Sequence, residues 1–153
     1  MNDRKELLAY CDLYCGDCAG HSGRLAAAAA ELVKAVEAHE FDRTAECLFA
    51  EEIPDYSAFR ETLGFLTELR CEAPCRARDP SAIPCAVKAC CIERGHFACH
   101  ECDGFETCDT LRENAERCGY ASLENIRSIR ETGLDAWLAS DKRRWFRPER
   151  GSR

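Results

Sequence analysis

Apolar residues recur three or four positions apart over several stretches of this 153-residue chain. The clearest stretch is Arg24–His39, in which Leu25, Leu32 and Val36 fall on one side of a helix and Lys34 falls on the other. This spacing is typical of a helix that packs one face against the rest of a protein. We therefore predict an amphipathic helix there.

Further helices are predicted on the same grounds, and no stretch alternates between apolar and polar residues as a strand would. Asn2 or Asp3 can cap a short first helix that carries Leu7 and Leu8. We expect the apolar positions at the end of the chain to serve packing rather than a binding site. The other predicted helices are Tyr56–Arg70, Thr107–Arg117 and two closing helices with Leu123, Ile126, Ile129, Leu134, Trp137 and Leu138 as their apolar positions.

The segments between these helices are expected to be irregular. Residues 41–49 are predicted to be a loose connection, and residues 71–108 contain Pro74, Pro80 and Pro84, which interrupt regular structure. No repeat and no long linker divides the chain. We therefore predict a mainly α protein, one small helical domain over residues 1–153 with irregular cysteine-rich metal-binding loops.

Thirteen cysteines add chemistry to this outline. The sequence opens with charged residues where a signal peptide has an apolar core, and no window approaches the roughly 20 apolar residues of a membrane span. We therefore expect a cytoplasmic location. Because cytosolic thiols stay reduced, dense cysteine spacing there favours metal binding over disulfides.

The cysteines are spaced as metal ligands are. Two C-x2-C pairs place two thiolates in one turn, where they can face a single ion, and two further pairs stand four residues apart. We predict that Cys99 and Cys102 bind one ion together, with outer ligands from Cys85, Cys90 or Cys108. The full set of predicted metal ligands is Cys11, Cys15, Cys18, Cys71, Cys75, Cys85, Cys90, Cys99, Cys102 and Cys108.

The remaining cysteines and the histidines have simpler interpretations. Cys47, Cys91 and Cys118 are predicted to be small buried apolar residues. His21 and His96 each stand three residues from a C-x2-C pair and could supply a nitrogen ligand. Because there are enough thiols without them, all four histidines are expected to be solvated.

Several functions are compatible with this pattern. The leading hypothesis is zinc held in closed, structural four-thiolate sites of a protein-interaction module whose partner the sequence does not identify. The alternative is an iron–sulfur redox or electron-transfer protein, because Cys11, Cys15 and Cys18 with a distant fourth thiolate suit a cubane cluster. A third hypothesis uses the adjacent Cys90 and Cys91 for metal trafficking or redox chemistry. No HExxH, GxSxG or phosphate-binding loop is present, so no catalytic constellation is identified.

Charge narrows the choice of partner. The chain has a formal net charge of −7, although residues 141–153 hold six Lys or Arg against two acidic residues. The body of the chain is therefore acidic enough to repel phosphate backbones. Neither nucleic acid nor a membrane is expected as a partner, and an unidentified protein is left as the candidate.

Three segments together resemble the uncharacterised cysteine-rich domain-of-unknown-function family DUF3795. They are AYCDLYCGDC, CAVKACCIERGHFACHECDGFETCDTL and LENIRSIRETGLDAWLASDKRRW. The family pattern has a Cys-Gly-Leu-Tyr-Cys-Gly-x-Cys opening, a cysteine pair, a Cys-x4-Cys helix start, a C-x2-C knuckle and a Pro-Cys step. The resemblance maps these onto the ten predicted ligands and implies metal binding by analogy.

This chain departs from that pattern at three places. Asp12 stands where the family has glycine, and Thr107 replaces the proline before Cys108. The spacing from Cys71 to Cys75 is one residue wider than is common in the family. The family has no established activity, so the resemblance implies no reaction.

Overall fold

The computed structural model describes residues 3–79, 81 and 84–147, and within them every regular element is a helix. The mainly α prediction is therefore confirmed, and isolated bridges pair Leu8 with Tyr14 and Tyr120 with Phe146. The predicted helix cap by Asn2 or Asp3 cannot be compared with the structure, because Asn2 and the side chain of Asp3 are not described. Pro80, predicted to interrupt regular structure, also lies outside the described residues. None of the described helices is both long and apolar enough to cross a bilayer.

The chain divides into two compact units, which we describe separately. Unit 1 comprises residues 1–18 and 73–153, and unit 2 comprises residues 19–72. Unit 2 thus interrupts the sequence of unit 1 between Cys18 and Ala73. The single domain expected over residues 1–153 stays a prediction.

Unit 2 consists of four helices, two of which the periodicity predicted. α3 (Arg24–Ala38) and α5 (Tyr56–Glu68) match the predicted stretches to within two residues at each end. The loose connection predicted over residues 41–49 is wrong, because α4 (Phe41–Leu48) forms there and buries Ala45 on its inner face. The fourth helix is the single turn α2 (Ala19–Ser22).

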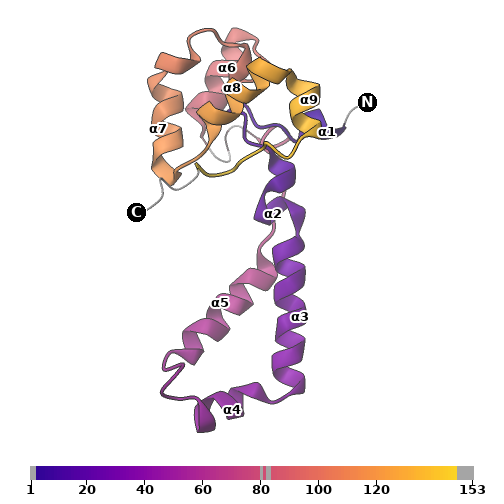
Figure 1. The fold of residues 1–153 in the computed structure, drawn as a ribbon, viewed down its shortest axis with the longest axis vertical. Coiled ribbons are helices and arrows are strands. Elements are labelled where there is room, and N and C mark those ends of the chain that lie inside the picture. Colours follow the sequence, from indigo (N-terminus) through magenta and orange to yellow (C-terminus); the bar gives the residue numbers. More distant parts are fainter. Residues whose placement is uncertain (1–2, 80, 82–83, 148–153) are drawn as a thin grey trace. The chain divides into compact units, whose positions relative to one another are not determined.

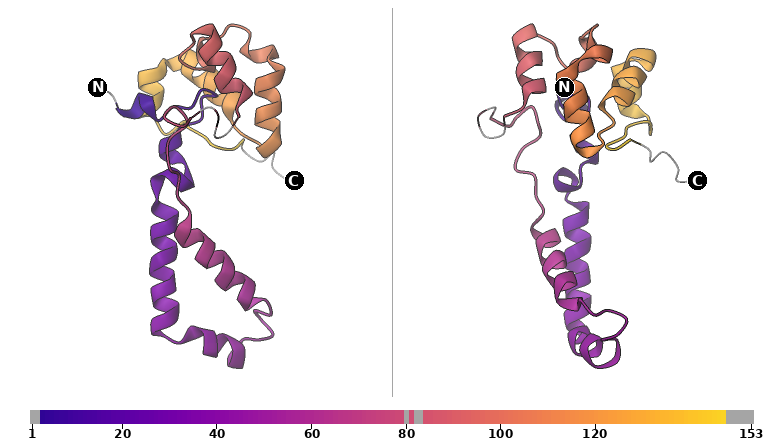
Figure 2. Two further views of the ribbon diagram at one scale, coloured as in Figure 1. Left: turned by 180° about the vertical axis from the view of Figure 1, so that it is seen from behind. Right: turned by 90° about the vertical axis from the view of Figure 1, so that its left-hand side faces the viewer.

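The helices of unit 2 enclose a triangle, with α3, α4 and α5 as its sides (Figure 1). Gly23 starts α3 with a φ of 67°, a left-handed conformation that glycine adopts without strain. α3 and α5 are in contact, and the left view of Figure 2 shows them converging toward α2. There the N–H of Cys71 donates to the carbonyl of Gly20 at 3.0 Å, so the two ends of unit 2 are bonded to each other.

Unit 1 is built from short helices and three 3-10 turns. α6 (Ala86–Arg94) occupies part of the stretch expected to be irregular, so that prediction is wrong there. The helix start that the family resemblance implied at Cys85 and Cys90 is present. α6 follows Pro84 and ends at Gly95, whose φ of 69° provides a left-handed helix cap. The helices are α1 (Asp3–Glu6), α6 (Ala86–Arg94), α7 (Asp109–Cys118), α8 (Ser122–Thr132) and α9 (Leu134–Ala139), and the turns are η1 (Cys15–Asp17), η2 (Cys99–Glu101) and η3 (Phe105–Thr107).

The closing helices form the core of unit 1. Trp137 is completely buried, and Leu138 and Ile129 are nearly so, packed with Leu8 and Ala98. The prediction that these helices serve packing is therefore confirmed. Leu8 belongs to this core although it lies after α1 rather than within it.

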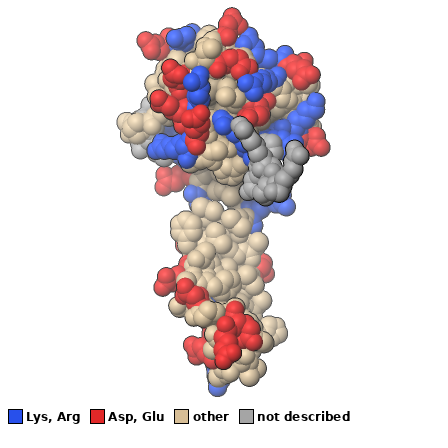
Figure 3. All heavy atoms as spheres, turned by 60° about the vertical axis from the view of Figure 1, so that its left-hand side comes forward, with Lys and Arg blue, Asp and Glu red and all other residues tan. Residues whose placement is uncertain are grey.

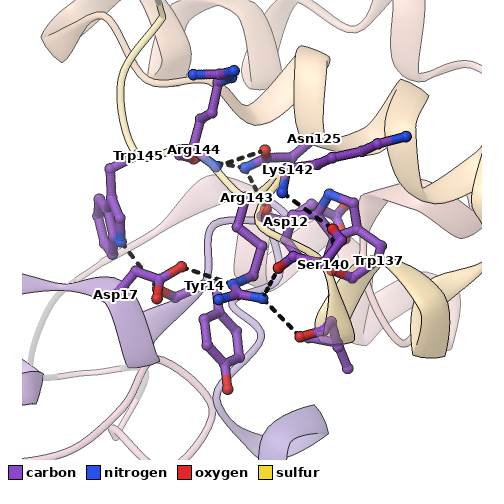
Figure 4. A network of polar contacts seen from close by, with 11 residues as sticks. Asp12, Tyr14, Asp17, Asn125, Trp137, Ser140, Lys142, Arg143, Arg144 and Trp145 are labelled. Carbon is purple, nitrogen blue, oxygen red and sulfur yellow. Dashed lines mark hydrogen bonds and ion pairs between the residues drawn. The ribbon is translucent and has the colours of Figure 1, made fainter.

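The segment after α9 is bonded to the beginning of the chain (Figure 4). The indole N–H of Trp145 donates to the carbonyl of Tyr14 at 3.0 Å. Arg143 pairs with Asp17 at 2.8 Å and donates to the carbonyls of Leu138 and Ser140. Arg143 and Trp145 thus hold the two ends of unit 1 together. The sequence analysis had considered this basic segment only for its charge.

Trp137→Ala should destabilise unit 1 severely. Removing a fully buried indole leaves a cavity and typically costs about 3–5 kcal/mol. Urea unfolding followed by circular dichroism measures the change. Phe146→Ala is the control, because Phe146 is 61% exposed and its loss should cost below about 1 kcal/mol. Equal effects of the two substitutions would contradict the packing role of the closing helices.

Candidate thiol site

Both C-x2-C pairs fold as single 3-10 turns with the same backbone bond. The N–H of Cys18 donates to the carbonyl of Cys15 at 3.0 Å, and that of Cys102 to the carbonyl of Cys99 at 3.0 Å. The expected turns therefore form. The expected sharing of one ion by each pair stays a prediction.

The N-terminal segment anchors the first cysteine of each turn. The N–H of Cys99 donates to the carbonyl of Tyr10 at 2.9 Å, and that of Cys15 donates to the carbonyl of Leu7 at 2.7 Å. Cysteines far apart in sequence are thereby brought to one segment of backbone, residues 7–15.

Asp12, which stands where the family pattern has glycine, lies at the centre of this segment. Its φ is 61°, in the left-handed region, which explains why glycine suits the position and why aspartate, unlike most residues, is tolerated there. The carboxylate is completely buried and accepts the backbone N–H of His100 at 2.8 Å and its Nδ1 at 2.6 Å. The side chain of His100, expected to be solvated, is only 11% exposed and pairs with Asp12, so that prediction is wrong.

Burial raises the pKa of Asp12, and the hydrogen bonds and charge of His100 oppose this rise. The backbone around the carboxylate is also fixed, because Asn125 donates to the carbonyls of Asp12 at 3.0 Å and of Arg144 at 2.8 Å. Asp12 thus joins the turn containing Cys99 to helix α8. Nothing in the sequence marked this contact, because its partners lie 88 and 113 residues away.

Two thiols of the site, Cys91 and Cys99, have their sulfurs 3.7 Å apart in the interior of unit 1. Cys91 was predicted to be a small buried residue, and its burial is confirmed. The sequence analysis missed that its sulfur faces Cys99. The hydrogen bond between them lowers the pKa of Cys91 and raises that of Cys99, because the thiolate that forms first accepts the remaining S–H.

Other cysteines surround this pair. Cys11, Cys85 and Cys108 pack against the apolar cluster that contains Cys91 and Cys99. Cys11 also belongs to a second cluster, with Cys15 and Cys75. Burial above all, with a smaller contribution from the nearby Cys75, raises the pKa of Cys11 to about 12. The Cys11 thiol therefore holds its proton unless a cation replaces it.

Two cations hold the loop that carries Cys75. Arg76 lies over the ring of Phe97 at 3.7 Å and donates to its carbonyl at 2.6 Å. Lys88, buried on α6, donates to the carbonyls of Cys75 at 3.0 Å and Arg78 at 2.5 Å. Besides the hydrogen bond from Cys99, the positive charge of Arg76 lowers the pKa of Cys91, whereas burial and the charges of Asp12 and Glu101 raise it.

The structure separates some cysteines that the spacing had grouped. Cys71 belongs to unit 2 and Cys75 to unit 1. Cys47 and Cys118 are exposed, so their interpretation as buried apolar residues is wrong. The remaining predicted ligands of unit 1, Cys18, Cys90 and Cys102, are half-buried. Over the residues that the structure describes, no group of three or more His, Cys, Asp or Glu side chains is arranged to hold a metal ion.

Asp12→Asn should destabilise unit 1 by about 1–3 kcal/mol, because an amide can accept from only one of the two N–H groups of His100 and leaves a buried donor unpaired. Asparagine tolerates the left-handed backbone, so the loss reports on the carboxylate alone. Chemical denaturation gives the free energy of unfolding. The matched control is Asp103→Asn, whose side chain is 95% exposed in an ion pair with Arg130 and should matter by less than about 1 kcal/mol. Similar losses in the two variants would refute the role given to Asp12.

A family model described as a protein of unknown function (DUF3795) matches residues 7–113, more than half of the chain. The matched range contains Asp12 and all ten predicted metal ligands and ends within α7. The closing segment that also carried the resemblance lies outside it. No curated protein and no solved structure matches the chain.

Proposed function

Because the chain belongs to the DUF3795 family, whose description assigns no activity, we propose its function from its own thiols. It is a zinc-binding protein in which Cys91 and Cys99 are two ligands of a structural thiolate site in unit 1. The observation that carries this proposal is the distance of 3.7 Å between their sulfurs.

That distance suits one ion between two thiolates. Zinc–sulfur bonds are about 2.3 Å long, so two sulfurs on one tetrahedral zinc are separated by roughly 3.8 Å. A disulfide would need about 2.05 Å. The pair therefore has the separation of two ligands on a shared ion, before any movement of the backbone.

The proton balance of the site also supports a cation. Two buried thiols that share a hydrogen bond lose a first proton more readily than a second. A bound zinc ion replaces such protons, because a coordinating thiol is deprotonated outright. Cys11, from the same cluster, and Cys102, from the same turn as Cys99, are the further ligands that we propose.

The proposed role of the ion is structural. Four thiolates close the coordination of zinc and leave no position for a substrate or an activated water. The thiols must stay reduced for this, so a cytoplasmic location is part of the proposal. Zinc would then order the turns of Cys99 and Cys102 around a core that already packs through Trp137 and Leu138.

Elemental analysis of anaerobically purified protein should find zinc, and Cys91→Ser and Cys99→Ser should each lose most of it, because a serine hydroxyl is a poor ligand beside thiolates. Cys47→Ser is the control, since Cys47 is exposed in unit 2 and should leave the metal content unchanged. Chelation should lower the melting temperature of the parent protein while leaving most of its helical signal.

Other results would overturn the proposal and name its replacement. Iron and sulfide in place of zinc, with visible absorption, would establish the cluster alternative. Metal-free protein in which mass spectrometry finds a bond between Cys91 and Cys99 under mild oxidation would establish a redox thiol pair. Full zinc retention in both serine variants would place the ion elsewhere.

A further inference from the structure

Unit 2 exposes far more apolar surface than unit 1. Of the nine large hydrophobic side chains that are exposed within the described residues, seven belong to unit 2 although it is the smaller unit. They are Leu25, Leu32, Leu48, Phe49, Ile53, Phe59 and Phe65. Exposed apolar residues gathered on one part of a protein mark an interaction surface more often than single ones do.

Part of this surface is hollowed. A cavity of about 360 Å³ is lined by Leu32, Val36 and the rings of Phe41 and Phe59, among others. A second cavity of about 470 Å³ shares both rings and adds Ile53. The two cavities therefore form one apolar groove between α3, the start of α5 and the loop that precedes it.

Aromatic contacts make the floor of the groove. The ring centroids of Phe41 and Tyr56 lie 5.9 Å apart, and those of Tyr56 and Phe59 lie 5.6 Å apart. Rings at these separations support one another, so the groove is held open by its own side chains. It needs no partner to form.

Carboxylates border the groove. A third cavity of about 600 Å³ shares Ile53 and Tyr56 with it and is lined by Glu46, Glu61 and Asp42, the last of which pairs with Arg60 of the same lining at 3.2 Å. Figure 3 shows acidic side chains gathered at the end of unit 2 where Figure 1 places α4. Unit 2 has 11 Asp or Glu against 5 Lys or Arg, a net −6 of the −7 carried by the chain.

We infer that this groove binds a basic amphipathic helix of a partner protein. Apolar anchors one turn apart on such a helix would enter the groove beside Phe41 and Phe59, and Lys or Arg on its flanks would meet Glu46 and Glu61. The inference rests on unit 2 alone and does not depend on metal in unit 1.

The same charges disfavour other occupants. A second copy would bring a face of −6 against a face of −6, and anionic lipid or nucleic acid would be repelled as well. The basic end of this chain is already engaged up to Arg147, through Arg143, Trp145 and the bond from the Arg147 N–H to the Gly119 carbonyl. The residues beyond it, PERGSR, contain no large apolar anchor besides the proline.

The test uses the full chain and two labelled synthetic peptides of about 18 residues, long enough for five helical turns. Both carry Leu and Phe anchors at i, i+4 and i+7, and they differ only in flanks of Lys or of Glu. Fluorescence anisotropy should show the basic peptide bound at least about tenfold more tightly than the acidic one, with affinity falling as salt rises.

Two phenylalanines of α5 provide matched variants. Phe59→Ala should weaken binding of the basic peptide about tenfold or more, because Phe59 lines the groove. Phe65→Ala should leave it unchanged, since Phe65 is a similarly exposed residue that lines neither part of the groove. The side chain of Phe59 is 42% exposed and that of Phe65 is 65% exposed. Both variants should therefore keep the helical signal and the metal content of the parent.

Three outcomes would overturn the inference. Equal binding of the basic and acidic peptides would show that charge does not select the partner. Equal effects of Phe59→Ala and Phe65→Ala would show that the groove is not the binding site. Self-association of the chain that Phe59→Ala abolishes would show that a second copy is the occupant. Loss of zinc binding in unit 1 affects none of these readouts, so the two proposals fail separately.

Discussion

The thiol arrangement of unit 1 depends on one buried carboxylate. Asp12 accepts both N–H groups of His100 and thereby fixes the turn that begins at Cys99. In the same backbone segment, the carbonyl of Tyr10 accepts the backbone N–H of Cys99, and the carbonyl of Asp12 accepts the side-chain amide of Asn125. The sulfurs of Cys91 and Cys99 lie 3.7 Å apart only while the turn that begins at Cys99 is held in place, because a displacement of that turn would separate them. A residue that departs from the family pattern thus supports the contact between Cys91 and Cys99.

The sequence predicted what depends on local spacing. Periodicity located α3 and α5, and C-x2-C spacing correctly predicted two tight turns. Helix α4 was missed because its apolar positions span only about two turns, too short a stretch for periodicity to mark. The prolines led to an irregular prediction for residues 71–108, and only the helix start of the family pattern implied a helix where α6 begins.

The spacing of residues along the sequence could not predict contacts between distant residues. The sequence offered no reason to prefer Cys91 over the adjacent Cys90, because helix geometry turns neighbouring side chains about 100° apart and only the packing of α6 decides which one faces Cys99. The same holds for His100, whose burial requires a carboxylate 88 residues earlier.

The two units divide the chemistry of the chain between them. Unit 1 holds all cysteines except Cys47 and Cys71 and is nearly neutral, whereas unit 2 holds most of the exposed large apolar side chains and most of the net charge. A core that excludes water keeps its thiols poorly solvated, which suits the proposed metal site. An acidic apolar groove has to be exposed to solvent for a partner to reach it. Because unit 2 begins and ends at one bonded point, Gly20 and Cys71, its sequence can vary without displacing the thiols. The fold therefore assigns the proposed partner surface and the proposed thiol site to separate units of one short chain.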